Sequence, residues 1–540
     1  MGAVVGAGGR SRPRWLAGLW RSLWWSPLMA GSSAVCYVLA FPGIGLWPLA
    51  FVALLPLTHG LLRSAAGPRE ALWLGLCFGV FTQLLGYSFL LGTLERFSGF
   101  PVWLCVPIVL LFGVYQGLPF GLWALVFDAL RRRGRDALLL SPFVWVALEL
   151  VYPQIFPTYF GNALVETENL RQGAELGGPM LLSWLLVALN AALYRGVVER
   201  RPTAGVWSLV VLCGLFWGYG HHRIAAVDGQ MQAARERGAT LRVGIVQANL
   251  GLHDKREDPA AAVQKHRQLS LELERRQRLD LLLWPETAVA QSLPHDVASV
   301  AELLSPLRTP VLFGALTFDV SDRDAEGRAR IGNSALLAGA HGRVQAIGHK
   351  QRLVPFAERV PFSEQLAWLR RLSPLGGGLS PGSESPAFVL DGTRLTVLIC
   401  YEDILPDYVR ERVVRDRPQL LVNLTNDAWF GDTRAATIHM ALSRLRAVEH
   451  RRALVRATNS GISALIDPTG RVVAETRNSE RVGLSGQVVL LDVPSRYGRL
   501  GDWPGWVGLL VVALALGLPG RRQRERRMGT KSMARAPGSA

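Results

Sequence analysis

Long runs of uncharged, apolar residues fill the chain before residue 222 and return once near its C-terminus. A helix needs about 20 consecutive apolar residues to cross the hydrocarbon core of a bilayer, and several of these runs reach that length. Lipid offers no hydrogen-bond partner to an open backbone, so such runs are predicted to be helices. We therefore expect eight membrane spans. They cover residues 25–42, 45–62, 70–92, 101–130, 137–157, 175–195, 203–220 and 504–519.

The stretch between the seventh and eighth expected spans has a different character. From about residue 241 to residue 493 it has the mixed composition of a water-soluble domain. A chain of 540 residues is long enough for more than one domain. We therefore predict a membrane domain of about seven helices at 1–222, a large water-soluble domain at 223–500, and a last membrane helix with a basic tail at 501–540.

The formal net charge of +17 could indicate nucleic-acid binding, but the positions of the arginines argue against it. They gather in the short loops 63–69, 131–136 and 195–202, and the middle domain has no basic stretch interleaved with aromatic residues. Short cytoplasmic loops carry Lys and Arg, so the pattern indicates membrane topology. With an even number of spans, both termini are predicted to lie in the cytoplasm and the middle domain on the opposite side. Nucleic acid is excluded as a partner.

The connection at 153–174 lies outside the cytoplasm in this topology and carries several aromatic residues with Gly161 and Asn162. One interpretation is an interfacial loop that contributes to an aromatic belt. The other is a lipid access surface beside the catalytic domain. The sequence leaves both open.

The middle domain alternates apolar strand-like runs with polar helical stretches. Several of these runs are apolar throughout, which indicates strands buried on both faces and therefore an α/β layered fold. The Gly/Pro/Ser-rich stretch 373–386 is predicted to be a mobile lid. The expected strands are 241–248, 281–286, 311–318, 333–340, 343–350, 395–399, 419–425, 453–458, 463–467 and 486–491, and the expected helices are 258–278 and 436–452.

Three of these runs end in a polar residue with chemical potential. LLLWPE ends in Glu286, RVQAIGHK ends in Lys350, and the strand before CYED delivers Cys400 to a turn. Catalytic side chains of α/β enzymes are presented at strand ends in this way. A carboxylate, an ammonium and a thiol make a plausible base, oxyanion stabiliser and nucleophile.

Cys400 is the one cysteine of the middle domain, so a structural disulfide within that domain is excluded. The other cysteines lie in apolar spans, where they act as small hydrophobic residues. The chain also has 4 lysines among 59 basic residues, so it uses arginine where only a positive charge is needed. A lysine at a strand end therefore suggests that the compact ammonium of Lys350 is required.

Further motifs surround these residues. They are WPE at 284–286, HKQRLVPFAERVPF at 349–362, CYE at 400–402, NLTNDAWFG at 423–431 and RATNSGISALIDPTG at 456–470. With them the middle domain resembles the carbon–nitrogen hydrolase (nitrilase) superfamily, and the whole chain resembles bacterial apolipoprotein N-acyltransferases. The resemblance implies a multi-span helical membrane domain and an α-β-β-α layered sandwich.

The resemblance also implies roles for individual residues. Glu286, Lys350 and Cys400 are the implied catalytic set, and Glu358, Tyr401 and Glu402 support it. Trp284, Asn426 and Trp429 are possible pocket residues, although a structural turn explains Asn426 and Trp429 equally well. The chain departs from the family at Lys255-Arg256, where a Lys-Trp pair is usual, so one aromatic lipid contact is in question.

The implied reaction takes an acyl chain from a membrane glycerophospholipid, holds it as a thioester on Cys400, and passes it to the N-terminal amine of a diacylglyceryl-cysteine on an apolipoprotein. This places the enzyme in the bacterial inner membrane with its catalytic domain on the periplasmic side, and we expect a monomer. The histidines show no zinc-ligand spacing, and no phosphate loop is present, so we expect neither metal nor cofactor. Two alternatives remain: a membrane-tethered amidase for small amides, and a membrane scaffold without activity.

Overall fold

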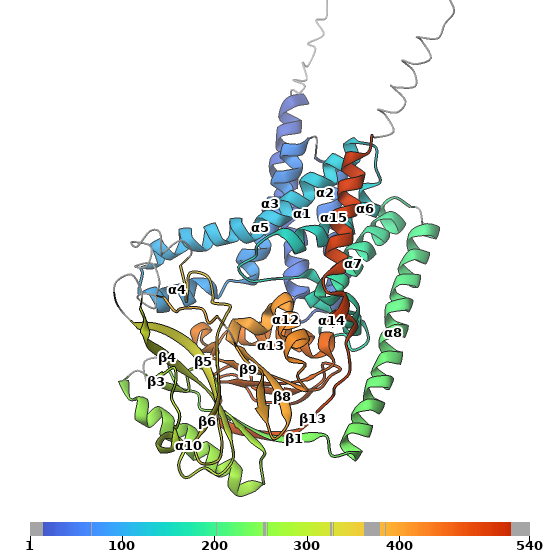
Figure 1. Ribbon diagram of the computed structural model, residues 1–540. Helices are drawn as coiled ribbons and strands as arrows, with labels where there is room; N and C mark the ends of the chain where they lie inside the picture. The colour runs from blue at the N-terminus through green and yellow to red at the C-terminus, as the bar shows by residue number, and fades with distance from the viewer. Residues whose placement is uncertain are drawn as a thin grey trace, which may run out of the picture.

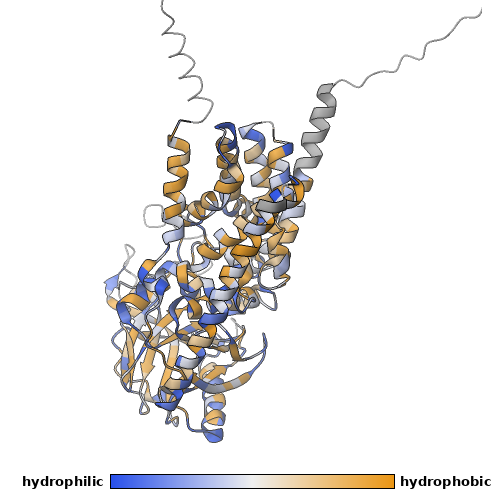
Figure 2. Cartoon of the chain, turned by 90° about the vertical axis from the view of Figure 1, so that its right-hand side faces the viewer, coloured by the Kyte–Doolittle hydropathy of each residue, from blue (hydrophilic) through white to orange (hydrophobic). Residues whose placement is uncertain are grey.

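The computed structural model describes residues 14–65, 67–200, 202–251, 255, 257–323, 327, 329–360, 378–383 and 385–519. A bundle of helices lies at one end and a β-sandwich at the other, with the long helix α8 (Pro202–Glu236) running beside both (Figure 1). Apolar residues dominate the bundle, whereas the sandwich carries many hydrophilic residues on its outside (Figure 2). The membrane domain and the water-soluble domain predicted from composition are therefore both present.

The bundle is built from helices of unequal length. They are α1 (Arg14–Ala40), η1 (Trp47–Phe51), α2 (Leu55–Arg63), α3 (Pro68–Gly86), α4 (Leu90–Ser98), α5 (Val102–Arg132), α6 (Ala137–Val151), η2 (Phe160–Leu164), η3 (Leu170–Gly173), α7 (Ala174–Leu193), the π-helical η4 (Tyr194–Val198), α8 and α15 (Trp503–Gly517). Large apolar side chains such as Trp103, Leu111, Trp207 and Trp506 are exposed on these helices, as expected for surfaces that face lipid.

Within the described residues, two helical stretches are long and apolar enough to cross a bilayer, Val102–Arg132 and Leu170–Val198. The number becomes three if the pair Pro68–Gly86 and Leu90–Arg96, bent by 57°, is one broken span. Shorter apolar helices are Pro27–Ala40, Trp47–Arg63, Ala137–Val151 and Trp503–Gly517. The eight spans stay a prediction.

Several boundaries of the expected spans need correction. The expected span 70–92 is interrupted after Gly86, and the expected span 137–157 ends as a helix at Val151. The expected span 203–220 is only the first half of α8, which continues to Glu236. A continuous helix does not stop where its apolar residues stop, so composition alone could not place this end.

Close packing of α3 against α5 depends on small residues. A Cβ atom added to Gly79 would lie 2.2 Å from the carbonyl oxygen of Gly117, and one added to Gly75 would lie 2.4 Å from that of Phe120. Glycine at these positions lets the two backbones approach, as is common between membrane helices.

The other domain contains two sheets that face each other. Among the described residues, one sheet has the order β13-β1-β2-β4-β5-β6, with β3 on β4, and the other has the order β12-β11-β10-β9-β8-β7. The strands are β1 (Thr240–Gln247), β2 (Leu281–Leu283), β3 (Val289–Pro294), β4 (Val311–Arg323), β5 (Ala329–Ala338), β6 (Val344–His349), β7 (Phe388–Leu390), β8 (Thr393–Ile399), β9 (Leu420–Thr425), β10 (Ala453–Thr458), β11 (Ala464–Ile466), β12 (Val472–Glu475) and β13 (Val482–Val489).

Helices cover the outer face of each sheet. The strand period of two sends Val397 and Ile399 of β8 into the core between the sheets, and Leu398 into the core under α12 and α13. Leu269 and Leu273 of α10 cover the other sheet. The predicted α-β-β-α layering is confirmed. The helices of this domain are α10 (Pro259–Arg276), α11 (Ala301–Leu304), α12 (Pro406–Asp416), α13 (Ala435–His450) and α14 (Arg496–Leu500).

The connection at 153–174 lies between the two domains. Glu166 accepts two hydrogen bonds of 2.9 Å from Arg444 of α13, and Glu168 accepts one of 2.6 Å from Arg471. At the end of this segment, Arg451 pairs with Glu175 of α7 at 2.7 Å. This segment therefore fixes the sandwich onto the bundle. Its two interpretations, as part of an aromatic belt or as a lipid access surface, stay predictions.

Candidate active site

The three predicted strand ends meet on one side of the sandwich. Glu286 follows β2, and Lys350 directly follows β6 in the same sheet, whereas Cys400 directly follows β8 of the facing sheet. The ammonium of Lys350 lies 3.3 Å from Oε1 of Glu286, and it interacts electrostatically with the sulfur of Cys400. In the sequence, Lys350 lies 64 positions and Cys400 lies 114 positions after Glu286. The two sheets thus bring together residues that are far apart in the chain.

Lys350 is completely buried between two carboxylates. Its Nζ donates to Oε1 of Glu358 at 2.8 Å as well as to Glu286. Burial would lower the pKa of this ammonium, but Glu358 and Glu286 outweigh that effect and hold its pKa well above the ordinary value. Lys350 therefore stays charged, as an oxyanion stabiliser must.

Glu286 keeps one oxygen open. Its Oε1 accepts hydrogen bonds from Lys350 and from the side-chain amide of Asn333, the latter at 2.7 Å. Its Oε2 is buried and has no hydrogen-bond partner within the described part of the chain. A buried acceptor without a partner is costly, and it is the arrangement expected of a base that waits for a proton donor.

Cys400 occupies a tight turn between β8 and the 3₁₀ helix η6 (Cys400–Ile404). Its φ angle is +52°, a left-handed conformation that a non-glycine residue seldom adopts. Its carbonyl accepts a hydrogen bond of 3.2 Å from Asn423. Burial, and next the nearby Glu286, raise the pKa of the thiol well above its ordinary value, although Lys350 opposes them. The resting sulfur is therefore a thiol, so the nucleophile role predicted for Cys400 would require a base.

Glu402 connects the two catalytic loops. Its Oε1 accepts from the backbone N–H of Gln351 at 2.7 Å and of Arg352 at 3.1 Å, and its Oε2 accepts from Ile399 at 2.8 Å. The carboxylate thus joins the segment after Lys350 to the strand that carries Cys400. The supporting role of Glu402 stays a prediction. Glu358 likewise holds Lys350 and accepts from the backbone N–H of Val354 at 2.8 Å.

Tyr401 points toward the membrane domain. Its hydroxyl donates to the backbone carbonyl of Ile155, in the 153–174 connection, and its ring meets that of Phe156 edge-on at 6.0 Å. The residue after the nucleophile is therefore in contact with the bundle.

The predicted pocket residues have mixed outcomes. Trp284 is fully buried in the core under α10, where its Nε1 donates to Ser270 at 2.9 Å, so the prediction that it lines a pocket is wrong. Its indole packs against His266 and Phe313 instead. Asn426 caps the 3₁₀ helix η7 (Asp427–Phe430), since its Oδ1 accepts from Ala428 at 3.3 Å. Trp429 lies half-buried in η7, and its role stays a prediction.

Lys255 is a second buried lysine near the base. Its Nζ donates to the carbonyl of Thr287 at 3.4 Å, and burial lowers its pKa to about 8 although Glu286 opposes the shift. Arg256, which replaces the usual aromatic residue, lies outside the described residues. Residues 373–377 and 384 of the predicted lid, and residues 361–372 before it, also lie outside the described residues.

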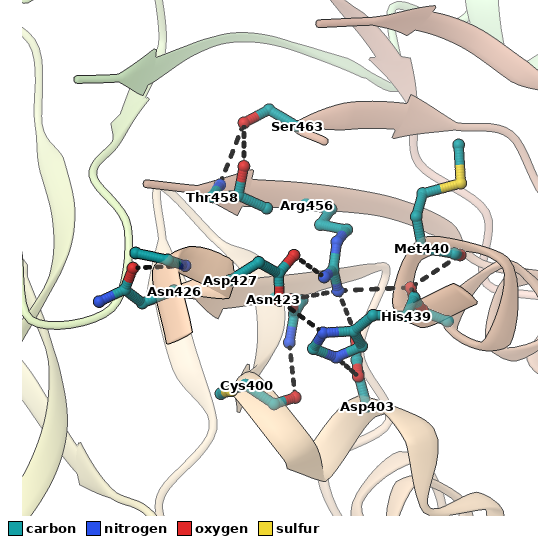
Figure 3. A network of polar contacts seen from close by, with 12 residues as sticks. Cys400, Asp403, Asn423, Asn426, Asp427, His439, Met440, Arg456, Thr458 and Ser463 are labelled. Carbon is teal, nitrogen blue, oxygen red and sulfur yellow. Dashed lines mark hydrogen bonds and ion pairs between the residues drawn. The ribbon is translucent and has the colours of Figure 1, made fainter. Parts of the chain in front are cut away.

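Sequence reasoning missed a network of charges behind Cys400 (Figure 3). Asp403 and Asp427 both accept from the ring of His439, at 3.0 and 2.8 Å, and both accept from the guanidinium of Arg456, at 2.7 and 3.0 Å. Arg456 also donates to Asn423 at 2.9 Å, and Asn423 reaches the carbonyl of Cys400. A chain of hydrogen bonds thus extends from the network to the turn that holds the nucleophile.

The electrostatics of the network favour an imidazolium. Burial and the adjacent Arg456 would lower the pKa of His439, but Asp403 and Asp427 raise it to about 9. Burial would raise the pKa of Asp427, but His439 and Arg456 together hold it below the ordinary value. Two cations and two carboxylates therefore balance one another. The only signal in the sequence is that Asp427 and Arg456 belong to two of the five quoted motifs, NLTNDAWFG and RATNSGISALIDPTG.

The described residues contain no group of His, Cys, Asp and Glu that could hold a metal ion. A buried carboxylate and ammonium beside a half-buried thiol, at the edge of an α-β-β-α sandwich, define a carbon–nitrogen hydrolase domain, here joined to a membrane bundle. The family descriptions agree, since "Carbon-nitrogen hydrolase" matches residues 242–493 and "Apolipoprotein N-acyltransferase N-terminal domain" matches residues 33–192.

Relatives match over almost the full length. A protein of Geobacter metallireducens named apolipoprotein N-acyltransferase is 32% identical, over 92% of this chain and 95% of its own. One of the same name from Azotobacter vinelandii is 31% identical, over 94% of this chain and 97% of its own. The chain belongs to the apolipoprotein N-acyltransferase family. Among solved structures, an amidase of the nitrilase superfamily from Nesterenkonia is 22% identical and covers 48% of this chain and 93% of its own, with a TM-score of 0.34.

Proposed function

We propose that this protein transfers an acyl chain from a membrane glycerophospholipid to the N-terminal amine of a diacylglyceryl-cysteine on an apolipoprotein. The observation that carries the proposal is the meeting of Glu286, Lys350 and Cys400 beside a turn that contacts a membrane bundle through Tyr401 and Ile155. Both substrates are anchored in lipid, so a site held at the membrane meets them at high local concentration.

In the first half-reaction, the open Oε2 of Glu286 takes the thiol proton and the sulfur of Cys400 attacks an ester carbonyl. The ammonium of Lys350 and the backbone N–H of Tyr401 stabilise the oxyanion, an effect worth about 2.7–4 kcal/mol for each donor. The tetrahedral intermediate then expels the glycerol oxygen, which receives the proton from Glu286. A lysophospholipid leaves, and the acyl chain remains as a thioester.

In the second half-reaction, the amine of the acceptor attacks the thioester carbonyl. Glu286 takes the proton that the amine loses, the C–N bond forms, and the C–S bond breaks. The leaving sulfur takes this proton from Glu286, which restores the thiol of Cys400. The products are an N-acylated lipoprotein and the resting enzyme, which closes a ping-pong cycle. Water has to be kept from the thioester, because its attack would release a free fatty acid.

Mass spectrometry of the acyl-enzyme tests this proposal. After incubation with a phospholipid that carries a labelled acyl chain, the peptide containing Cys400 should gain the mass of that chain, and hydroxylamine should remove it. The Cys400→Ala variant should gain nothing and should leave lipoprotein N-termini unacylated in a deletion strain. Full N-acylation in that strain would contradict the proposal and favour the inactive scaffold.

The amidase alternative requires release of ammonia from small amides. The fold allows that chemistry, but the membrane bundle and the contact between Tyr401 and Ile155 have no role in it. Ammonia release by the wild-type protein, without any labelled thioester from phospholipid, would favour the amidase.

The topology belongs to this proposal too. The arginine-rich loops support cytoplasmic termini and a periplasmic sandwich in the bacterial inner membrane. A reporter that is active only in the periplasm should be active when fused near residue 300 and inactive when fused after residue 530. We also propose a monomer, which the mass of the protein in detergent, corrected for bound detergent, would test.

A further inference from the structure

A short segment, residues 152–156, lies between the membrane bundle and the reactive turn. All of its residues are described, and they form neither helix nor strand. The hydroxyl of Tyr401, next to Cys400, donates to the carbonyl of Ile155, and its ring meets that of Phe156 edge-on at 6.0 Å. Backbone without regular structure needs other groups to bind its N–H and C=O groups. The side chains that bind this segment therefore also hold the neighbour of the nucleophile.

One side chain of α5 supplies the segment with both an acceptor and a donor. Oε1 of Gln116 accepts from the N–H of Ile155 at 2.7 Å, and its Nε2 donates to the carbonyl of Phe156 at 2.9 Å. Gln116 is fully buried in a helix that is long and apolar enough to cross a bilayer. Burial of an amide is costly unless it is hydrogen-bonded, and an apolar side chain would serve for packing alone. The two bonds to the segment are therefore what this glutamine contributes.

The part of α5 that binds the segment is itself held in place. Pro119 has no N–H, so the carbonyl of Tyr115 lacks its helical partner, and this carbonyl accepts from the hydroxyl of Tyr152 at 2.6 Å instead. Two residues further, Gly117 lies against α3, where a Cβ atom added to it would come within 2.7 Å of the carbonyl carbon of Gly79. Helix α5 is therefore fixed at the level where it contacts the segment.

Ile155 connects this helix to the nucleophile, because it is bound at both its N–H and its carbonyl. Gln116 binds the N–H, and the hydroxyl of Tyr401 binds the carbonyl. From the sandwich, Asn423 donates to the carbonyl of Cys400 at 3.2 Å. The left-handed backbone at Cys400 is costly and persists only where the surroundings enforce it. The turn therefore depends on contacts from both domains.

We propose that Gln116 is a positioning residue for the acyl transfer, and that it acts through Ile155 and Tyr401. It fixes the turn in which the backbone N–H of Tyr401 is the proposed oxyanion donor. The inference rests on the proposed function and adds to it a residue of the membrane bundle. The bundle then sets the geometry of the reactive turn, in addition to keeping the site close to its lipid-anchored substrates.

A double-mutant cycle tests this coupling. The rate at which Cys400 is acylated is measured in the purified full-length protein with two donors, phosphatidylethanolamine and a short p-nitrophenyl ester. Gln116→Met, which keeps the shape of the side chain but makes neither bond, should lower the maximal rate about tenfold with both donors and change KM by less than about twofold. Tyr401→Phe should lower the rate by a similar factor, because it removes the other bond to Ile155. The double variant should be slower by about tenfold rather than about a hundredfold, because either change breaks the same link.

Asn190→Leu is the matched control. Asn190 is a buried amide of α7 that binds backbone in the same way, since its Oδ1 accepts from the N–H of Leu54 at 2.9 Å and its Nδ2 donates to the carbonyl of Ala50 at 2.8 Å. Tyr401 bonds to a different segment. The control should therefore lower the melting temperature to a similar extent as Gln116→Met, but it should leave the acylation rate within about twofold. Gln116→Asn is a milder second variant, one methylene shorter, and its loss of rate should also disappear when Tyr401 is already Phe.

The outcomes separate this inference from the proposed function. An unchanged rate in both Gln116 variants, or a loss of about a hundredfold in the double variant, would overturn the positioning role and leave the proposed function standing. A loss of rate in Asn190→Leu as large as that in Gln116→Met would also overturn it, because the effect would then be a general loss of structure. If the p-nitrophenyl ester acylates wild-type Cys400 but phosphatidylethanolamine does not, the proposed function fails, and the cycle with the p-nitrophenyl ester still decides the role of Gln116.

Discussion

Two clusters of buried charge lie near Cys400, and they differ in how completely their carboxylate oxygens are paired. In the first, formed by Glu286, Lys350 and Glu358, an ammonium is shared by two carboxylates, and Oε2 of Glu286 stays open. In the second, formed by Asp403, Asp427, His439 and Arg456, every carboxylate oxygen accepts a hydrogen bond. Unpaired acceptors belong to groups that move protons, whereas fully paired ones hold a shape. We therefore assign reaction to the first cluster and positioning to the second.

The largest effect is expected for Lys350→Met. The change removes the proposed oxyanion stabiliser and leaves Glu286 and Glu358 buried without a cation, so the acylation rate should fall about 10³-fold and the free energy of unfolding by about 3–5 kcal/mol. Acylation kinetics and denaturant unfolding would measure the two effects. Lys265→Met, at a half-exposed position of α10, is the control and should change neither. A stable Lys350→Met protein would contradict the pairing described here.

Glu286→Gln should separate the reaction from stability. The amide cannot take the thiol proton, so the acylation rate should fall about 10²- to 10³-fold, as for loss of a general base. The free energy of unfolding should change by less than about 1 kcal/mol, because the amide oxygen can still accept from Asn333 and Lys350. Glu272→Gln on the exposed face of α10 serves as control. Equal losses of rate and stability would remove the distinction between the clusters.

His439→Gln tests the second cluster. The change takes a cation from between two buried carboxylates, so unfolding should become easier by about 3 kcal/mol. The folded variant should keep the acylation rate within about tenfold, because the residue contacts no reacting atom. His341→Gln, at an exposed position, should be neutral. A loss of rate as large as that of Glu286→Gln, in a stably folded variant, would make His439 part of the reaction.

Without any substitution, pH alone should change the stability of the protein through the second cluster. The folded pKa of His439 is raised to about 9, so its contribution is complete below the unfolded value of 6.5 and is lost as the pH rises from there toward 9. The free energy of unfolding should fall by up to about 3 kcal/mol in this window. Asp427 has the opposite sign, because its depressed pKa gives stability that is lost only in acid. Between pH 6 and 9, denaturant unfolding should show a smaller change in the free energy of unfolding for His439→Gln than for the wild-type protein.

The first cluster could be predicted because its signal is local. A buried strand that ends in a polar residue is visible in a few letters, and it led directly to Glu286, Lys350 and Cys400. The second cluster gave no such signal, since His439 belongs to a helix of ordinary composition. It lies 36 residues from Asp403 in the sequence, and only the fold brings the two side chains together. Charged residues are usually exposed, so nothing local indicated that these would be buried together.

Other differences have equally physical causes. Helix α12 is absent from the predicted helices, because its polar composition concealed a buried face that includes Arg412. The strands β3, β7 and β12 are absent from the predicted strands, because they are short or half-exposed and their alternation of apolar and polar residues is weak. Trp284 comes just before Glu286 in the motif but is held in the core by Ser270, His266 and Phe313. Apolar runs located the membrane helices, but helix breaks such as that after Gly86 depend on packing.

The hydrogen bond from Tyr401 to Ile155 has a consequence for engineering by recombination. A chimera that joins the sandwich of one homologue to the bundle of another would place a foreign backbone against the residue next to the nucleophile. Functional hybrids should therefore need residues 153–174 and the face of α13 from the same parent. Crossovers inside α8 would disturb the same region, because α8 packs on this segment: a Cβ atom added to Gly220 would lie 2.0 Å from the carbonyl oxygen of Asn169.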